Sequence, residues 1–327
     1  MSVAARWRVL ATPRSFFEEG RDAVEWLTQA GVEVVPSPVD RPLQEDELAA
    51  LLGEVDGVVV GVDRIGRRAL AAGRPRLRVV ARNGIGVDTV DVAAATELGV
   101  VVTNAPSVNA DSVADFTFAL LLALVRRVVE ADRAVREGRW PRLVGVELRD
   151  RCLGLLGFGR IGQRVAERAR GFGMRTVAYD PVPDLAAAER LGVRLVSFPE
   201  VLAQADFLSL HLPLTPQTRH LLGEEELRCM KPGSFLVNTA RGGVVDEAAL
   251  ARALKEGWIA GAACDVFDEE PPRTSPLLQA PNVLLSPHMA SHTREAIARA
   301  SRVAAENVLA VLQGGRPPNA VNPEVLR

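Results

Sequence analysis

The chain has 327 residues, of which 48% are hydrophobic and 24% charged, and its 39 basic and 41 acidic side chains give a net charge of −2. This length favours two domains, and the balanced charge argues against nucleic acid or an anionic membrane as a partner. The cysteines Cys152, Cys229 and Cys264 are widely spaced and form no CxxC motif. We therefore expect no metal site and no disulfide framework, and a cytoplasmic protein.

The first hundred residues alternate short β-branched runs with helical patterns. The predicted strands are 8–10, 32–35, 57–60, 77–80 and 100–102. Helical patterns cover 20–30 and 46–52. This alternation is typical of a parallel sheet with helices on its faces.

A long apolar helical segment, residues 107–139, comes next and predicts one buried helix or two joined ones. Its most apolar part, residues 116–125, is too short to span a bilayer, so we expect no membrane partner. The segment also suits a subunit interface, and we expect a homodimer formed through residues 107–140.

A second alternating series follows this segment. Its predicted strands are 152–156, 175–179, 207–211, 235–238, 261–264 and 283–286. A closing helix at 293–313 can return to the first domain. We therefore expect an α/β protein with two doubly wound, Rossmann- or flavodoxin-like parallel-sheet domains and a cleft between them. The expected boundaries are 1–104 plus 292–327 for a discontinuous domain and 105–291 for the other.

A GxGxxG motif lies between the first strand and the first helix of this second series. Gly157 would permit the tight turn, Gly159 would let the backbone approach a pyrophosphate, and Gly162 would let the helix pack on the strand. The phosphates would lie over the helix N-terminus, where free N–H groups and the helix dipole favour anions.

Asp180 ends the next strand, 23 residues after Gly157, close to where an acidic side chain meets the adenosine ribose in dinucleotide-binding folds. Such an acid repels the extra phosphate of NADP. The alternative is a plain turn residue before Pro181. Together with the glycine motif, Asp180 predicts dinucleotide binding and favours NAD over NADP.

Several further motifs follow one another along nearly the whole chain. They are Arg82-Asn-Gly-Ile-Gly-Val-Asp88, the glycine motif, His211-Leu-Pro-Leu-Thr-Pro216, Lys231-Pro-Gly, Asn238-Thr-Ala-Arg-Gly-Gly-Val-Val-Asp246, Asp265-Val-Phe-Asp-Glu-Glu-Pro271 and Ser286-Pro-His288. In this order they resemble the D-isomer-specific 2-hydroxyacid dehydrogenases. That resemblance implies an NAD-dependent oxidoreductase that interconverts a 2-keto acid and a D-2-hydroxy acid.

The resemblance implies three catalytic residues, Arg241, Glu270 and His288. The planar guanidinium of Arg241 can hold the carboxylate and ketone oxygens of a 2-keto acid. A histidine titrates near neutral pH, so His288 can donate a proton to the ketone oxygen or accept one in reverse. Glu270 would bind the other ring nitrogen and favour the protonated ring. Taken singly, the three could be a surface arginine, a loop acid and a structural histidine.

The resemblance also assigns other contacts. Beyond the glycine motif and Asp180, the implied cofactor-binding residues are Arg160, Ile161, His211, Pro213, Thr218, Thr239, Ala240 and Asp265. The implied substrate-binding residues are Asn83, Gly84 and Ile85, together with Arg241 and His288. A structural role for His211 stays open, and Arg82 either adds positive charge near the substrate or is simply exposed. Trp140 resembles a position that reaches a neighbouring subunit's site, with the anchoring of an interface as the alternative.

The substrate is expected to be small and unphosphorylated. By resemblance, phosphoglycerate enzymes of the family carry an arginine where this chain has Gly61; Arg64, Arg82 and Arg142 are the alternative cations, but they match the family incompletely. Glyoxylate or hydroxypyruvate is therefore the expected substrate, with D-3-phosphoglycerate dehydrogenase as the alternative activity. A non-catalytic, NAD-sensing corepressor-like protein is the alternative from another functional class.

Overall fold

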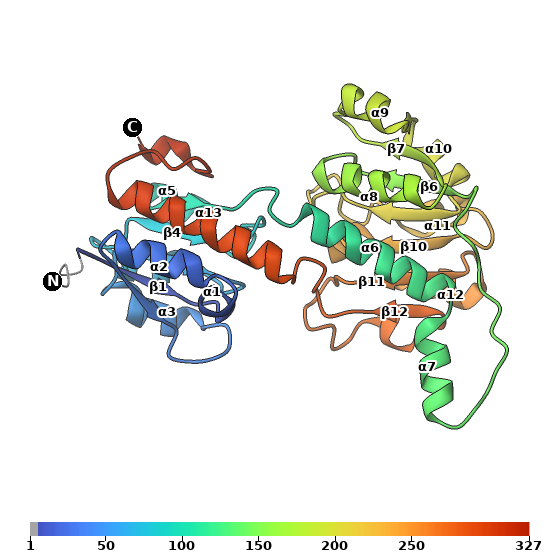
Figure 1. Cartoon of the computed structure of the whole chain (residues 1–327), viewed down its shortest axis with the longest axis horizontal. Coiled ribbons are helices and arrows are strands. Elements are labelled where there is room, and N and C mark those ends of the chain that lie inside the picture. Colours follow the sequence, from blue (N-terminus) through green and yellow to red (C-terminus); the bar gives the residue numbers. More distant parts are fainter. Residues whose placement is uncertain (1–5, 327) are drawn as a thin grey trace. The chain divides into compact units, whose positions relative to one another are not determined.

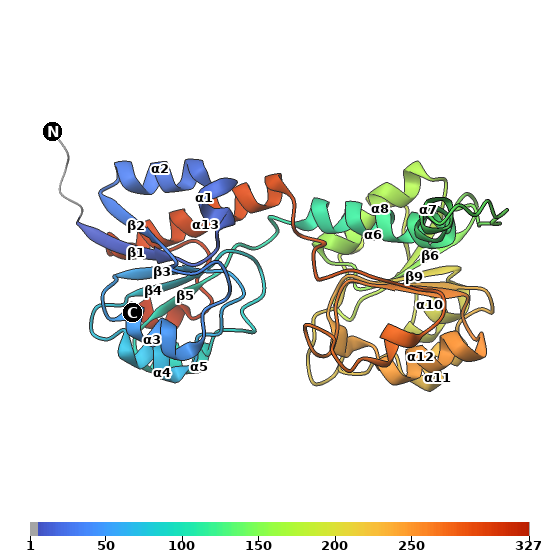
Figure 2. The ribbon, with the colours of Figure 1, turned by 90° about the horizontal axis from the view of Figure 1, so that it is seen from below.

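The computed structural model describes residues 6–326. The chain divides into two compact units. The first unit comprises Met1–Asn109 with His292–Arg327, and the second comprises Ala110–Ser291. Each unit contains a parallel sheet with helices on both faces (Figures 1 and 2), which confirms the predicted fold class.

Among the described residues, the sheet of the first unit has the strand order β2-β1-β3-β4-β5, and every neighbouring pair is parallel. The strands are β1 (Trp7–Ala11), β2 (Val32–Pro36), β3 (Gly57–Val60), β4 (Val79–Arg82) and β5 (Val101–Thr103). Strand β4 lies two residues later than the sequence predicts. Its register explains the difference, because Val79 pairs with Gly57 and Arg82 with Val60.

Helices cover both faces of this sheet. They are α1 (Ser15–Glu18), α2 (Arg21–Gln29), α3 (Glu45–Leu52), α4 (Arg67–Ala72), α5 (Val92–Glu97) and α13 (Arg294–Leu312), with the 3₁₀ turn η3 (Pro323–Leu326) near the C-terminus. Successive strand residues point to opposite faces. Val9 and Val59 pack in one core with α2 and α13, whereas Leu10 and Val58 pack with α3, α4 and α5. Figure 2 shows the two helical layers.

The sheet of the second unit is wider and has the order β12-β11-β10-β9-β6-β7-β8, again with parallel pairs throughout the described part. The strands are β6 (Cys152–Leu156), β7 (Arg175–Tyr179), β8 (Arg194–Leu195), β9 (Phe207–Leu210), β10 (Phe235–Asn238), β11 (Gly261–Cys264) and β12 (Val283–Leu285). Strand β8 is absent from the predicted series, because a two-residue strand carries no periodicity.

The helices of the second unit also form two layers. They are α6 (Ala110–Val125), α7 (Val128–Arg136), α8 (Arg160–Gly171), α9 (Leu185–Leu191), α10 (Phe198–Gln204), α11 (Glu224–Cys229) and α12 (Glu247–Glu256), with the 3₁₀ turns η1 (Gly242–Val244) and η2 (Pro276–Gln279). One core joins α6, α8 and α9 to the sheet, and the other joins α10, α11 and α12 to its opposite face.

The predicted helical segment 107–139 proves to be two helices, α6 and α7. Arg127 separates them in a left-handed conformation with φ of 55°. The apolar side chains of α6 are largely buried, including Phe118 and Leu121. By contrast, Val135 on α7 is 54% exposed and Trp140 just beyond it is 87% exposed. The second part of the segment therefore presents an apolar surface to solvent.

Candidate active site

The functional residues predicted for the second unit lie along one edge of its sheet. In a parallel sheet all carboxyl ends meet at the same edge, and ligands bind where the strand order reverses. Here β7 lies on one side of β6 and β9 on the other, so the reversal falls beside β6. In sheet order, the loops at this edge present His288 after β12, Glu270 after β11, Arg241 after β10, His211 after β9, Gly157 after β6 and Asp180 after β7.

The glycine motif forms the turn between β6 and α8. Gly157 has φ of +97°, and a Cβ there would lie 2.6 Å from the carbonyl of His211. A Cβ on Gly162 would overlap the carbonyl oxygen of Gly157. At Gly159, by contrast, no described atom lies within 4 Å of the Cβ position. The N-terminus of α8 is therefore open, and the N–H groups of Arg160 and Ile161 have no carbonyl partner within the helix.

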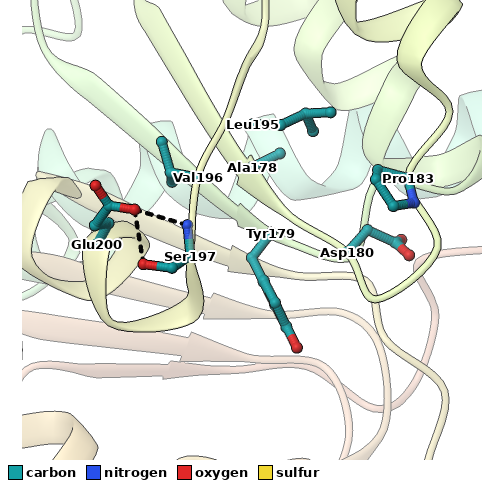
Figure 3. A pocket seen from close by; sticks show the side chains of 8 residues that line it. All are labelled: Ala178, Tyr179, Asp180, Pro183, Leu195, Val196, Ser197 and Glu200. Carbon is teal, nitrogen blue, oxygen red and sulfur yellow. Dashed lines mark hydrogen bonds between the residues drawn. The ribbon is translucent and has the colours of Figure 1, made fainter.

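A pocket with a volume of about 420 Å³ lies beside Asp180 at the ends of β7 and β8. Its lining residues, drawn in Figure 3, are Ala178, Tyr179, Asp180, Pro183, Leu195, Val196, Ser197 and Glu200. The lining mixes apolar side chains with the polar residues Asp180, Ser197 and Glu200, a combination that fits the flat ring and ribose of an adenosine. The turn, the open helix N-terminus and this pocket together fit a dinucleotide such as NAD.

His288 and Glu270 form a hydrogen-bonded pair, with 2.7 Å between His288 Nδ1 and Glu270 Oε2. Both side chains remain partly exposed, at 45% and 38%. The N–H of Phe267 donates to the other oxygen of Glu270 at 3.2 Å. Partial burial raises the pKa of Glu270, but the hydrogen bond and charge of His288, the Phe267 N–H and the charge of Arg241 outweigh it. The pKa of Glu270 is therefore lower than usual and the group is ionised at neutral pH.

Asp265 holds the turn that carries His288. It is fully buried, and its carboxylate accepts hydrogen bonds from the Ser286 hydroxyl (2.6 Å) and from the N–H groups of Met289 (2.9 Å) and Ala290 (2.8 Å). The Asp265 carbonyl also accepts the N–H of His288 at 2.8 Å, and His288 adopts a left-handed φ of 51°. No sequence pattern predicted this anchoring role, and the cofactor contact predicted for Asp265 stays a prediction.

Arg241 directly precedes η1, in the loop after β10. Its Nη1 donates to the carbonyl of Ala240 at 2.8 Å. Its charge is the smallest of the influences that lower the pKa of Glu270. Asn238 shapes the loop: its side chain accepts the N–H of Ala240 at 3.0 Å and donates to the carbonyl of Arg241 at 2.9 Å. Thr239, also assigned to the cofactor, is buried and lies 3.0 Å from Thr117 through the two hydroxyl oxygens.

His211 follows β9, and its Nε2 lies 2.9 Å from the Ser209 hydroxyl. Its Nδ1 is buried and has no hydrogen-bond partner among the described residues. Burial lowers the pKa of His211 to about 3, so the ring is neutral at physiological pH. In the same loop, the Thr218 hydroxyl donates to the carbonyl of Pro213 at 2.6 Å. The predicted cofactor contacts of these three residues remain predictions.

Asn83, Gly84 and Ile85, which are predicted to bind the substrate, belong to the first unit, where they follow β4. The guanidinium of Arg82 donates to the carbonyls of Asn83 and Gly86, each at 3.0 Å. Arg82 is therefore not simply exposed, because it joins the two ends of this loop.

Within residues 6–326, no group of three or more His, Cys, Asp or Glu side chains could hold a metal ion. In the same range, no helix has the length and apolar character needed to cross a membrane.

The second unit therefore has the architecture of a dinucleotide-dependent oxidoreductase, with a nucleotide-binding turn and an acid–histidine pair at one sheet edge. Residues 118–290 match the family model described as the NAD-binding domain of D-isomer specific 2-hydroxyacid dehydrogenases. The chain belongs to the D-isomer-specific 2-hydroxyacid dehydrogenase family.

Three relatives illustrate the similarity. A glyoxylate reductase of Korarchaeum cryptofilum is 50% identical over 260 residues, which cover 77% of this chain and 78% of the relative. A D-3-phosphoglycerate dehydrogenase of Methanocaldococcus jannaschii is 43% identical, with 92% of this chain and 57% of the relative covered. The apo-structure of D-lactate dehydrogenase from Escherichia coli superimposes with a TM-score of 0.85 at 30% identity, over 96% of this chain and 99% of that one.

These findings confirm the predicted enzyme class. The protein is a dehydrogenase that uses NAD(H) to interconvert 2-keto and 2-hydroxy acids. The alternative of a non-catalytic NAD-sensing protein is not favoured.

Proposed function

We propose that this enzyme reduces a small, unphosphorylated 2-keto acid, glyoxylate or hydroxypyruvate, with NADH. The observation that carries the proposal is the 2.7 Å contact between His288 and Glu270, at the sheet edge that also carries Arg241 and the glycine turn. The relative named glyoxylate reductase, at 50% identity, supports the choice of substrate. In the first unit, Gly61 provides no cation for a phosphate.

Each catalytic group has a role in this proposal that its chemistry permits. Arg241 binds the substrate carboxylate through its planar, permanently charged guanidinium. Glu270 accepts a hydrogen bond from the Nδ1–H of His288. This contact directs Nε2 to the ketone oxygen and stabilises the imidazolium. His288 then donates its Nε2 proton to that oxygen, and in the reverse reaction it takes the hydroxyl proton back. Bound NADH supplies the hydride that adds to the keto carbon.

The two units would divide the binding tasks, with residues 105–291 as the NAD-binding domain and 1–104 plus 292–327 as the substrate-binding domain. In the first, the N–H groups at Arg160 and Ile161 would meet the pyrophosphate, and Asp180 the adenosine ribose. In the second, the loop Asn83–Ile85 would offer backbone N–H groups to the substrate carboxylate. The Arg82 contacts support this assignment, because they occupy the carbonyls of Asn83 and Gly86 with a cationic donor in the same loop.

A homodimer formed through residues 107–140 is part of the proposal. The exposed apolar side chains of α7 and the following loop support it, since such patches mark protein interfaces. They include Val128 (52% exposed), Val135 (54%) and Trp140 (87%). Cytoplasmic location is also proposed, because Cys152, Cys229 and Cys264 are all free thiols.

A panel of substrates and cofactors tests the proposal. Initial rates would be measured with glyoxylate, hydroxypyruvate, pyruvate and 3-phosphohydroxypyruvate, each with NADH and with NADPH. We expect the highest kcat/KM for glyoxylate or hydroxypyruvate with NADH. His288→Gln should reduce turnover by roughly 10²–10⁴-fold, the usual contribution of a general acid, while NADH binding persists. A preference for 3-phosphohydroxypyruvate would reject the substrate proposal, and normal turnover of His288→Gln would reject the proton-donor role.

A further inference from the structure

A second glutamate, Glu247, forms hydrogen bonds with the loop that carries Glu270. Glu247 is the first residue of α12 and is only 8% exposed. One carboxylate oxygen accepts the backbone N–H of Asp268 at 2.7 Å. The other oxygen accepts a short hydrogen bond from the Ser275 hydroxyl. Both donors lie in the loop between β11 and η2, one on each side of Glu270.

Two consecutive N–H groups of this loop bind two different carboxylates. The N–H of Phe267 donates to Glu270, and the N–H of Asp268, one residue later, donates to Glu247. Rotation of the backbone between these two amides would break one bond or the other. The orientation of Glu270, and so its contact with His288, is thereby coupled to the carboxylate of Glu247.

The environment of Glu247 is unusual for a buried acid. No cationic side chain pairs with it within residues 6–326. Its stabilisation comes from neutral donors and from the N-terminal end of α12, where the helix dipole favours negative charge. Burying a carboxylate that has only neutral donors costs free energy. Both hydrogen bonds of Glu247 join it to the loop of Glu270, which indicates that its role lies in that loop.

We propose that Glu247 is a positioning residue for catalysis, which holds the 265–275 loop so that Glu270 meets His288. The inference rests on the proposed roles of Glu270 and His288. Glu247 itself touches neither substrate nor cofactor in this scheme and acts through Glu270.

A double-mutant cycle between Glu247→Ala and Glu270→Gln tests the inference in the full-length enzyme. We expect Glu247→Ala to lower kcat about tenfold and to leave the KM for NADH within about twofold, because only the reacting groups are disturbed. In the Glu270→Gln background, Glu247→Ala should lower kcat by less than about twofold, since the effects of residues that act as one unit are not additive.

Two further variants separate positioning from loss of structure. Glu247→Gln can still accept the Asp268 N–H through its amide oxygen and donate to Ser275 Oγ, so it should retain activity within about threefold. Glu256→Gln is the matched control, because Glu256 ends the same helix with an exposed side chain. It should behave like the unmodified enzyme.

The outcomes distinguish this inference from the proposed function. If Glu270→Gln is fully active, the proposed function fails. If Glu270→Gln is impaired but Glu247→Ala is fully active, or costs a further tenfold in that background, the positioning role fails. Should Glu247→Ala not bind NADH, Ser275→Ala replaces it in the cycle. A loss of kcat in Ser275→Ala, smaller than tenfold and absent in the Glu270→Gln background, would support the inference. An unchanged kcat in Ser275→Ala would overturn it.

Discussion

The carboxylate of Asp180 accepts a hydrogen bond from the backbone N–H of Phe158 at 2.7 Å. Its second oxygen accepts the N–H of Val182 at 2.9 Å. The two interpretations of Asp180, a turn residue and a selector of the cofactor, are therefore compatible. The same carboxylate that binds the Phe158 N–H of the glycine turn also lines the adjacent pocket.

Asp180→Asn separates the charge from the bracing contact. The amide oxygen can still accept the Phe158 N–H, whereas the negative charge that repels a 2′-phosphate is gone. We expect the ratio of kcat/KM for NADH over NADPH to fall about tenfold, equivalent to ~1.4 kcal/mol of charge repulsion. Asp184→Asn, at the N-cap of α9, is the control because asparagine caps helices equally well. An unchanged ratio would reject the ribose role of Asp180.

Arg241→Lys should raise the KM for the keto acid about 10- to 100-fold and leave NADH affinity unchanged. Lysine keeps the charge, but a compact ammonium cannot reproduce a bidentate contact with a carboxylate. Steady-state kinetics at saturating NADH would measure the change. A KM equal to that of the unmodified enzyme would count against carboxylate binding by Arg241.

Gly242→Ala should disturb both the Arg241 turn and the Glu270 loop. A Cβ on Gly242 would overlap the carbonyl carbon of Phe267, so the two backbones would have to separate. Overpacking of this kind costs roughly 1–3 kcal/mol, measurable by urea unfolding, and kcat should fall as well. Gly171→Ala is the control, since no described atom lies within 4 Å of its Cβ position. Equal stability and activity of the two variants would contradict the prediction.

His211 should make the fold sensitive to acid. Its pKa is about 3 in the folded protein, against an ordinary value of 6.5. Between these values the unfolded chain binds one more proton, so the free energy of unfolding falls as pH decreases, by up to about 1.4 kcal/mol per pH unit. Above pH 6.5 the His211 ring is neutral in both the folded and the unfolded chain, so the stability that is lost in acid is fully present there. His211→Asn should flatten the slope between pH 4 and 6 in urea unfolding.

The control for that measurement is His220→Asn. His220 is 45% exposed and has a positive φ of 51°, which asparagine tolerates. We expect it to keep the slope of the unmodified protein. A slope that His211→Asn leaves unaltered would show that another group titrates.

Local pattern was sufficient for much of this protein. Alternating β-branched and helical runs predict both parallel sheets, because periodicity and burial are properties of neighbouring residues. The glycine motif predicts the β6–α8 turn for the same reason, since Gly157 and Gly162 meet constraints set within a few residues. The family motifs identify the enzyme class and place Arg241, Glu270 and His288 in loops at strand ends.

Only the tertiary structure decided what supports those loops. Asp265 beneath the His288 turn, Glu247 on the Glu270 loop and Gly242 against Phe267 all make contacts between segments far apart in the chain. Such partners depend on which strands become neighbours in the sheet and on how the loops at its edge pack, and no local periodicity encodes them. In the sequence, a glutamate that supports a catalytic side chain cannot be distinguished from one that does not, and the same holds for a glycine.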